Sequence, residues 1–204
     1  MNRTRRILAA TAVLALAALL AASCCNRKKA AHANTAAVPE ENALCTAIDA
    51  YLTGEIGSYY DAAPHRIPFC DYLAVDDTDQ EDILVWGDFW LLNYQQAGDT
   101  LKCVSGGNHP GKLHVRKTAG GGFDVVSFEP VGDGNQFTPT AKAIFGDKFN
   151  AFQQAYSDEK RREEVRKSAL AAYVARKDLP VKYYQDYGWP AVQIPASRQE
   201  CYEK

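Results

Sequence analysis

The chain has 204 residues, of which 47% are hydrophobic and 11% aromatic, and this composition is typical of a folded globular protein rather than a disordered one. Its 23 basic and 25 acidic side chains give a net charge of −2. Removal of the three arginines in residues 1–23 would take this charge to −5. A nucleic-acid-binding protein concentrates basic side chains on one face, so we expect no nucleic acid among the partners.

The N-terminal residues have the pattern of an export signal. Three arginines within the first six residues precede residues 7–22, which carry no charge, and Ala21, Ala22 and Ser23 stand directly before Cys24. A basic head, an apolar stretch and small residues before a cleavage site are the parts of a secretory signal. The cysteine after the small residues resembles the lipobox of bacterial lipoproteins, with Ala21 at a position where leucine is common in that family.

The resemblance to lipoproteins implies that the chain is cleaved before Cys24 and acylated on the sulfur of that residue. Residues 1–23 would then be the signal peptide and residues 24–39 a flexible tether. The lipid membrane becomes a partner, and the cell envelope becomes the expected location. Cys25 stands where aspartate commonly retains such proteins on the inner membrane, so the outer membrane is preferred; Cys25 is also an alternative attachment site.

Two other interpretations of residues 7–22 stay open: an ordinary secretory signal and an uncleaved membrane span. A span needs about 20 apolar residues, whereas this run is shorter and rich in alanine. Cleavage followed by acylation is therefore the preferred expectation.

Residues 40–204 are predicted to form one α+β domain that starts with a helix. Pro39 suits a first helical position, while Gly54 and Gly57 weaken the other end, so the helix should stop near Tyr60. The apolar side chains of this segment recur at helical spacing and define one face. These side chains are Leu44, Ile48, Tyr51, Leu52 and Ile56.

The middle of the chain has the branched and aromatic composition of β-strands. The expected strands are residues 67–75, 83–94, 100–105, 113–117 and 123–128. Glycines and a proline in residues 105–111 predict a loop between the third and fourth of them. The short connections between successive strands indicate an antiparallel meander.

The last third of the chain is predicted to return to helix. Helix start and stop signals bracket residues 138–146, and aromatic side chains lie on one face of residues 149–156. A charged helix should follow over residues 157–177. The prolines of residues 178–204 predict an irregular, aromatic-rich tail that packs back on the domain.

The order of elements over residues 40–130, one helix and then a curled antiparallel sheet, resembles the cystatin-like and nuclear-transport-factor-2-like folds. In those folds the sheet wraps around the helix, because one apolar face must be covered. The expected architecture is an N-terminal helix packed on a curved antiparallel β-meander, with C-terminal helices and the irregular tail.

Four cysteines remain beyond the two near the proposed anchor. They are Cys45, Cys70, Cys103 and Cys201. Outside the cytoplasm this number favours two disulfides, with three connectivities open. None of the four lies in a CxxC pair, so we expect neither a zinc site nor a thioredoxin-like redox motif. No metal and no cofactor are predicted.

Four side chains of the strand predicted at residues 83–94 carry a ligand-binding hypothesis: Trp86, Asp88, Trp90 and Tyr94. Even spacing puts them on one face of the strand. The opposite face would hold Ile83, Val85, Phe89 and Leu91. Trp86 and Trp90 could stack on a small apolar or aromatic ligand that Asp88 orients. The alternative is that these rings belong to the hydrophobic core.

Two functions follow from this face of the strand. The preferred one is a non-catalytic binding or interaction protein of the cell envelope, with an envelope protein or a small stacking ligand as partner and no catalytic residue. The alternative is a small hydrolase or isomerase-like enzyme in which Asp88 and either His109 or His114 form an acid–base pair. A cavity that holds both a carboxylate and a histidine would favour the enzyme.

Overall fold

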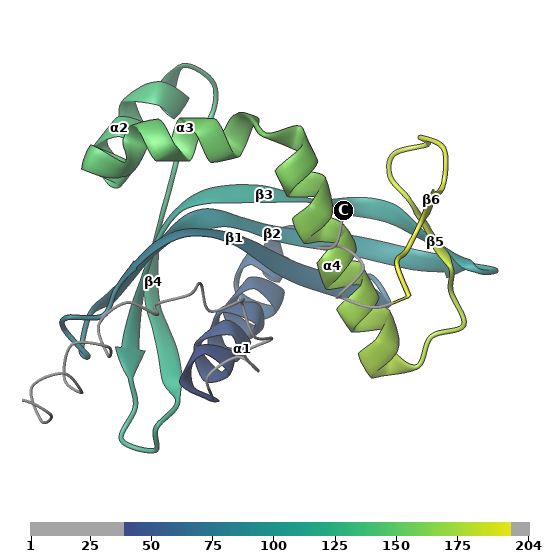
Figure 1. Ribbon diagram of the computed structural model, residues 1–204, viewed down its shortest axis with the longest axis horizontal. Coiled ribbons are helices and arrows are strands. Elements are labelled where there is room, and N and C mark those ends of the chain that lie inside the picture. The colour runs from purple at the N-terminus through teal and green to yellow at the C-terminus, as the bar shows by residue number, and fades with distance from the viewer. Residues whose placement is uncertain (1–38, 197–204) are drawn as a thin grey trace, which may run out of the picture. The chain divides into compact units, whose positions relative to one another are not determined.

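The computed structural model describes residues 39–196, and it has an α+β fold (Figure 1). Residues 1–38 and 197–204 lie outside the described residues, and with them the signal peptide, Cys24, nearly all of the tether, and Cys201. Helices pack on a curved sheet, so the predicted fold class is confirmed. Among the described residues, no helix is long and apolar enough to cross a membrane.

The elements follow the predicted order, with short 3-10 turns between some of them. The helices and turns are α1 (Pro39–Gly54), η1 (Ile56–Tyr59), η2 (Gly134–Gln136), α2 (Phe137–Phe145), η3 (Gly146–Lys148), α3 (Phe149–Ser157) and α4 (Glu159–Lys177). The strands are β1 (His65–Asp76), β2 (Ile83–Ala97), β3 (Thr100–Lys117), β4 (Phe123–Pro130), β5 (Tyr183–Gln185) and β6 (Val192–Gln193).

The first four strands form the expected antiparallel meander, in which each strand pairs with its neighbour in sequence. The predicted irregular tail contains two short strands, since β5 joins the sheet parallel to the start of β3 and β6 pairs with β5. Residues 186–191 between them form neither helix nor strand. Burial explains the addition of β5. Tyr184 is 1% exposed in the core, and a strand satisfies the backbone groups of a buried segment.

The predicted loop at residues 105–111 is also wrong, since β3 continues through it as one strand of 18 residues. Gly106 allows the backbone of β3 to lie close to β2. Gly106 has φ +119°, and a Cβ there would lie 2.2 Å from the Leu91 carbonyl oxygen. The pairing of β2 with β3 shifts register beside this point, between Asn93 and Tyr94. Glycine here marks a bulge and a close approach rather than a turn.

The sheet is covered on both faces, α1 packing on one and α2, α3 and α4 on the other (Figure 1). The predicted alternation along β2 is confirmed. One side packs against the predicted apolar face of α1, and its β2 residues are Ile83, Val85, Phe89 and Leu91. The other side faces the later helices, and its residues include Trp86, Asp88, Trp90 and Tyr94.

The cysteines differ from the prediction of two disulfides. Cys45, Cys70 and Cys103 are free thiols, whereas two bridges among four cysteines would require one bridge between these three. Cys45 accepts a hydrogen bond from Tyr72 on the α1 side of the sheet at 3.5 Å, and Cys103 packs in the core on the other side. Burial raises the pKa of the Cys70 thiol well above its ordinary value, so this group stays protonated and unreactive.

Candidate functional site

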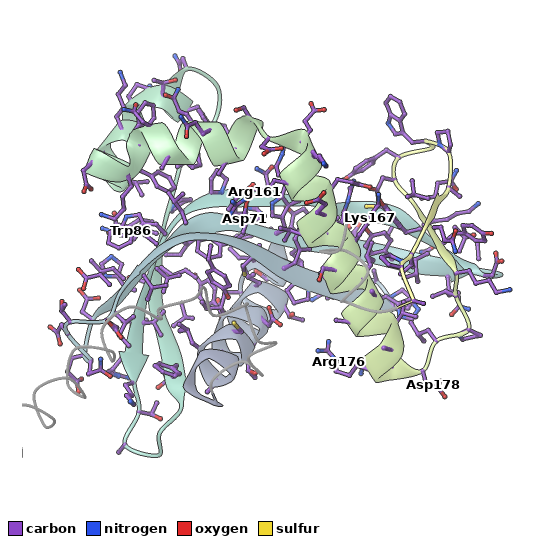
Figure 2. The ribbon with its side chains drawn as sticks, viewed as in Figure 1. Asp71, Trp86, Arg161, Lys167, Arg176 and Asp178 are labelled. Carbon is purple, nitrogen blue, oxygen red and sulfur yellow. The ribbon has the colours of Figure 1, made fainter. Side chains whose placement is uncertain are left out.

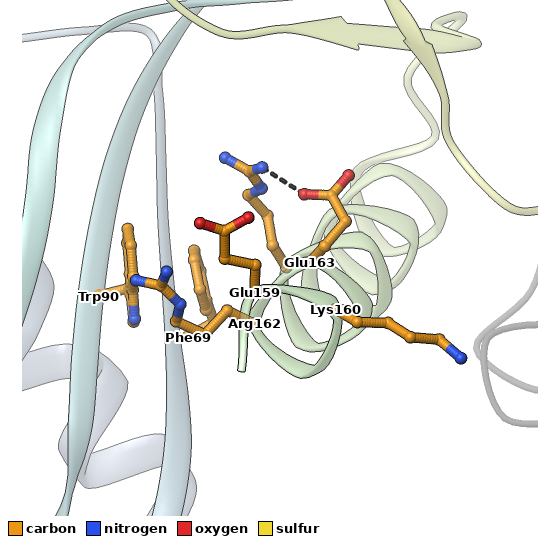
Figure 3. Close-up of a pocket in the computed structure, with 7 residues that line it drawn as sticks. Phe69, Trp90, Glu159, Lys160, Arg162 and Glu163 are labelled. Carbon is orange, nitrogen blue, oxygen red and sulfur yellow. Dashed lines mark hydrogen bonds and ion pairs between the residues drawn. The ribbon is translucent and has the colours of Figure 1, made fainter. Parts of the chain in front are cut away.

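A pocket of about 530 Å³ lies between the sheet and the first half of α4 (Figure 3). Its volume falls within the range of small-molecule sites. The lining combines two aromatic side chains from neighbouring strands with charged side chains from α4. These residues are Phe69, Trp90, Glu159, Lys160, Arg162, Glu163 and Arg166.

The start of α4 explains why charged groups face the sheet here. Asp158 caps the helix by accepting a hydrogen bond from the Arg161 backbone N–H at 3.0 Å. Glu159, Arg162, Glu163 and Arg166 then follow at spacings of three and four, and residues so spaced share one helix face. The pocket lies between these charged side chains and the strands.

Two aromatic rings from the strands form the side of the pocket opposite α4. Phe69 of β1 and Trp90 of β2 are cross-strand partners, and their rings stack with centroids 5.3 Å apart and planes 11° apart. The Trp90 indole N–H donates to Asp88 at 2.9 Å. This hydrogen bond fixes the orientation of the indole, so the Phe69–Trp90 pair is a preformed apolar surface.

Asp88 lies beneath this surface and is 6% exposed. Besides Trp90, its carboxylate accepts a hydrogen bond from Asn108 at 3.2 Å, and Asn108 also contacts the Tyr156 hydroxyl at 3.3 Å. Burial raises the pKa of Asp88 to about 6, although the bonds from Asn108 and Trp90 and the charge of Arg162 oppose this shift. Asp88 therefore supports the pocket from below and does not line it.

The arginines at the start of α4 differ in their partners. Arg161 makes a bidentate ion pair with Asp71, and Arg166 pairs with Glu163 and Asp186. Arg162 lies over the Tyr156 ring, 5.6 Å from its centroid. Within residues 39–196 no carboxylate pairs with Arg162, and its buried Nε has no hydrogen-bond acceptor.

The sequence-predicted ligand face is therefore divided between the pocket and the core. Trp90 lines the pocket. Trp86 is buried beneath α2 and α3 (Figure 2), where its indole N–H donates to the Ile144 carbonyl at 2.9 Å. Tyr94 is fully buried, and its hydroxyl donates to Asp186 at 3.3 Å. Trp86 and Tyr94 thus belong to the core, which was the alternative interpretation.

The two histidines lie apart from the pocket and have other partners than Asp88. His109 contacts the Tyr60 hydroxyl at 3.0 Å beside η1, and burial lowers the pKa of this histidine. His114 lies between Asp82 and Glu129, at 2.7 Å from each. The predicted Asp88–histidine pair is not formed among the described residues, so the geometry gives the enzyme hypothesis no support. Residues 39–196 also contain no group of three or more His, Cys, Asp or Glu side chains arranged so that it could hold a metal ion.

Sequence reasoning missed the charged half of the site. The signal was present in the spacing of Glu159, Arg162, Glu163 and Arg166, but a charged helix face normally faces solvent. Nothing in the sequence indicated that Phe69 lines the site, because its position beside Trp90 depends on the register of β1 against β2.

No family model, curated protein or solved structure matches the chain at a significant level.

Proposed function

We propose that the protein is a non-catalytic binding protein of the bacterial cell envelope, and that its pocket holds a small ligand with a flat apolar part. The observation that carries this proposal is the Phe69–Trp90 pair, which forms one side of a pocket of about 530 Å³. The Asp88 carboxylate holds the indole in place before any ligand arrives. A preformed aromatic surface binds planar groups at low entropic cost.

The expected affinity is modest. Burial of apolar surface contributes about 25 cal/mol per Å², and an aromatic pair contributes about 0.5–1.5 kcal/mol beyond that. At roughly 0.3 kcal/mol per non-hydrogen atom, a two-ring probe such as 2-naphthoate would bind with a Kd of about 1 mM. The natural ligand would use more of the pocket and bind more tightly.

Replacement of Trp90 tests this function. In calorimetric titrations with 2-naphthoate, Trp90→Leu should weaken binding about fivefold or more, because the stacking partner is lost. Trp90→Phe keeps a ring and should retain most of the affinity. Trp189→Leu is the matched control, since this tryptophan is 71% exposed in the tail and does not line the pocket.

Two results would contradict the proposed pocket. One is equal binding by the wild type and by Trp90→Leu, with both proteins shown to be folded by circular dichroism. The other is a loss of affinity in Trp189→Leu that matches the loss in Trp90→Leu.

The location in the envelope is a second part of the proposal, and it is supported by the sequence before Cys24 alone. Acyl chains on Cys24 would anchor the protein, since each buried methylene contributes about 0.8 kcal/mol. Mass spectrometry of the protein from a bacterial host should find a chain that begins at Cys24 and carries fatty acyl groups. Recovery of a chain with residues 1–23 still attached would contradict the anchoring.

A further inference from the structure

We infer that the ligand of this pocket is a small organic anion, and that its carboxylate binds the Arg162 guanidinium while its flat part lies against Trp90 and Phe69. This inference rests on the proposed function and names the chemical class of the ligand. It depends on the arrangement of charges around Arg162.

Arg162 lacks the anionic partner that its neighbours have. Arg161 is bound by Asp71 through both carboxylate oxygens, and Arg166 lies between Glu163 and Asp186. Among the described residues, Arg162 contacts the Tyr156 ring and acts electrostatically on the Asp88 carboxylate, but no carboxylate pairs with it and its buried Nε has no acceptor. A buried donor without an acceptor is unfavourable, so a bound anion at this position would remove an existing penalty.

The guanidinium of Arg162 is also placed where a ligand would meet it. Figure 3 shows this side chain extending from α4 toward Trp90 and Phe69, whereas Lys160 extends away from them. The Tyr156 ring contacts the guanidinium and offers no hydrogen-bond acceptor in the guanidinium plane. Planar N–H donors of this kind match the two oxygens of a carboxylate.

A second donor lies one helical turn away. The Nε of Arg166 is buried and has no acceptor within residues 39–196, although the two terminal nitrogens of this side chain bind Glu163 and Asp186. Arg166 also lines the pocket. The spacing of four residues puts Arg162 and Arg166 on the same helix face, so the side of α4 that carries Arg162 also carries this second donor.

Within residues 39–196, no carboxylate near the pocket forms an ion pair with Arg162, and this holds also for the exposed Glu159 of the lining. Glu163 is bound by Arg166, Lys167 and the Tyr184 hydroxyl. Asp88 accepts hydrogen bonds from Trp90 and Asn108. The lining carries three cationic and two anionic side chains, so the pocket has a net positive charge. A pocket of about 530 Å³ with two aromatic rings is larger and less polar than an inorganic anion requires, which favours an organic ligand.

A pair of nearly isosteric probes tests the inference on the full-length chain. 2-Naphthoate carries the carboxylate, and 2-naphthamide has the same rings without the charge. The wild type should bind 2-naphthoate about tenfold or more tightly than 2-naphthamide, because a hydrogen bond to a charged group contributes about 1.5–3 kcal/mol. Arg162→Gln should abolish this preference and leave the binding of 2-naphthamide unchanged.

Lys177→Gln is the matched control, because it removes one positive charge from α4. Lys177 is exposed in the last turn of the helix and does not line the pocket, so this variant should keep the preference for 2-naphthoate. Arg162→Lys keeps the charge and loses the planar N–H groups, so it should show an intermediate preference. This variant also tests the inference if Arg162→Gln does not fold.

The outcomes separate the two proposals. Equal binding of both probes by the wild type would overturn the inference and leave the proposed function standing. A preference that persists in Arg162→Gln would also overturn it. Failure of both probes to bind would overturn the proposed function and the inference together.

Discussion

Replacement of Gly106 by alanine is expected to destabilise the protein by about 3–5 kcal/mol. Gly106 has φ +119°, a backbone conformation that residues other than glycine rarely adopt. The added Cβ would lie 2.2 Å from the Leu91 carbonyl oxygen and 2.8 Å from the Leu92 Cα. Both atoms belong to the backbone of β2, which is paired on its other edge with β1. The strand therefore has no free direction in which to move.

Urea denaturation of the wild type and of Gly106→Ala measures this effect as a difference between their unfolding midpoints. Gly120→Ala is the control, since Gly120 lies in the turn between β3 and β4 and a Cβ there meets nothing within 4 Å. The control should stay within about 0.5 kcal/mol of the wild type. Similar midpoints for the two variants would refute the close approach of β3 to β2.

Arg161→Gln is expected to have the second largest effect, a loss of about 2–3 kcal/mol. Arg161 binds Asp71 in a bidentate pair, with Nε contacts of 2.8 and 3.0 Å, between β1 and α4 (Figure 2). The Asp71 side chain is 8% exposed, so the substitution leaves a buried carboxylate without its cation. The loss should be smaller than for a fully buried pair because the Arg161 side chain is 47% exposed.

The double variant Asp71→Asn with Arg161→Gln separates the ion pair from general packing. Removal of both charges should restore at least half of the stability lost in Arg161→Gln, because the unpaired buried charge is gone. Lys177→Gln is again the control, and thermal unfolding at low salt is the measurement. An Arg161→Gln protein as stable as this control would show that the pair does not hold α4 to the sheet.

The sequence predicted correctly the elements whose structure follows from the regular spacing of their apolar side chains. The apolar side chains of α1 repeat at helical spacing, and β2 alternates between two covered faces. The errors fall where the structure depends on which strand a segment pairs with. Residues 105–111 contain turn-forming residues, yet Gly106 allows close contact with β2 and Gly111 allows close contact with β4. Residues 183–185 form a strand because the start of β3 had an edge for β5 to join.

The candidate site could be predicted only in its aromatic part. Trp90 follows from the alternation of β2, but the same alternation applies to Trp86 and Tyr94, which α2, α3 and the tail cover. Which of the three remains open to a pocket depends on where α4 begins. The role of Arg162 likewise depends on the neighbouring acids, which bind Arg161 and Arg166 instead. Such pairing is tertiary and leaves no local signal in the sequence.

The position of a bound ligand is the most direct test of the pocket. The chain has three tryptophans, and each gives one indole N–H signal in a ¹H–¹⁵N spectrum, which single Trp→Phe variants would assign. Titration with 2-naphthoate should shift the Trp90 signal, whose N–H donates to Asp88 beneath the pocket. The signals of the buried Trp86 and the exposed Trp189 should stay in place. A saturating titration that leaves Trp90 unmoved would contradict ligand binding between the sheet and α4.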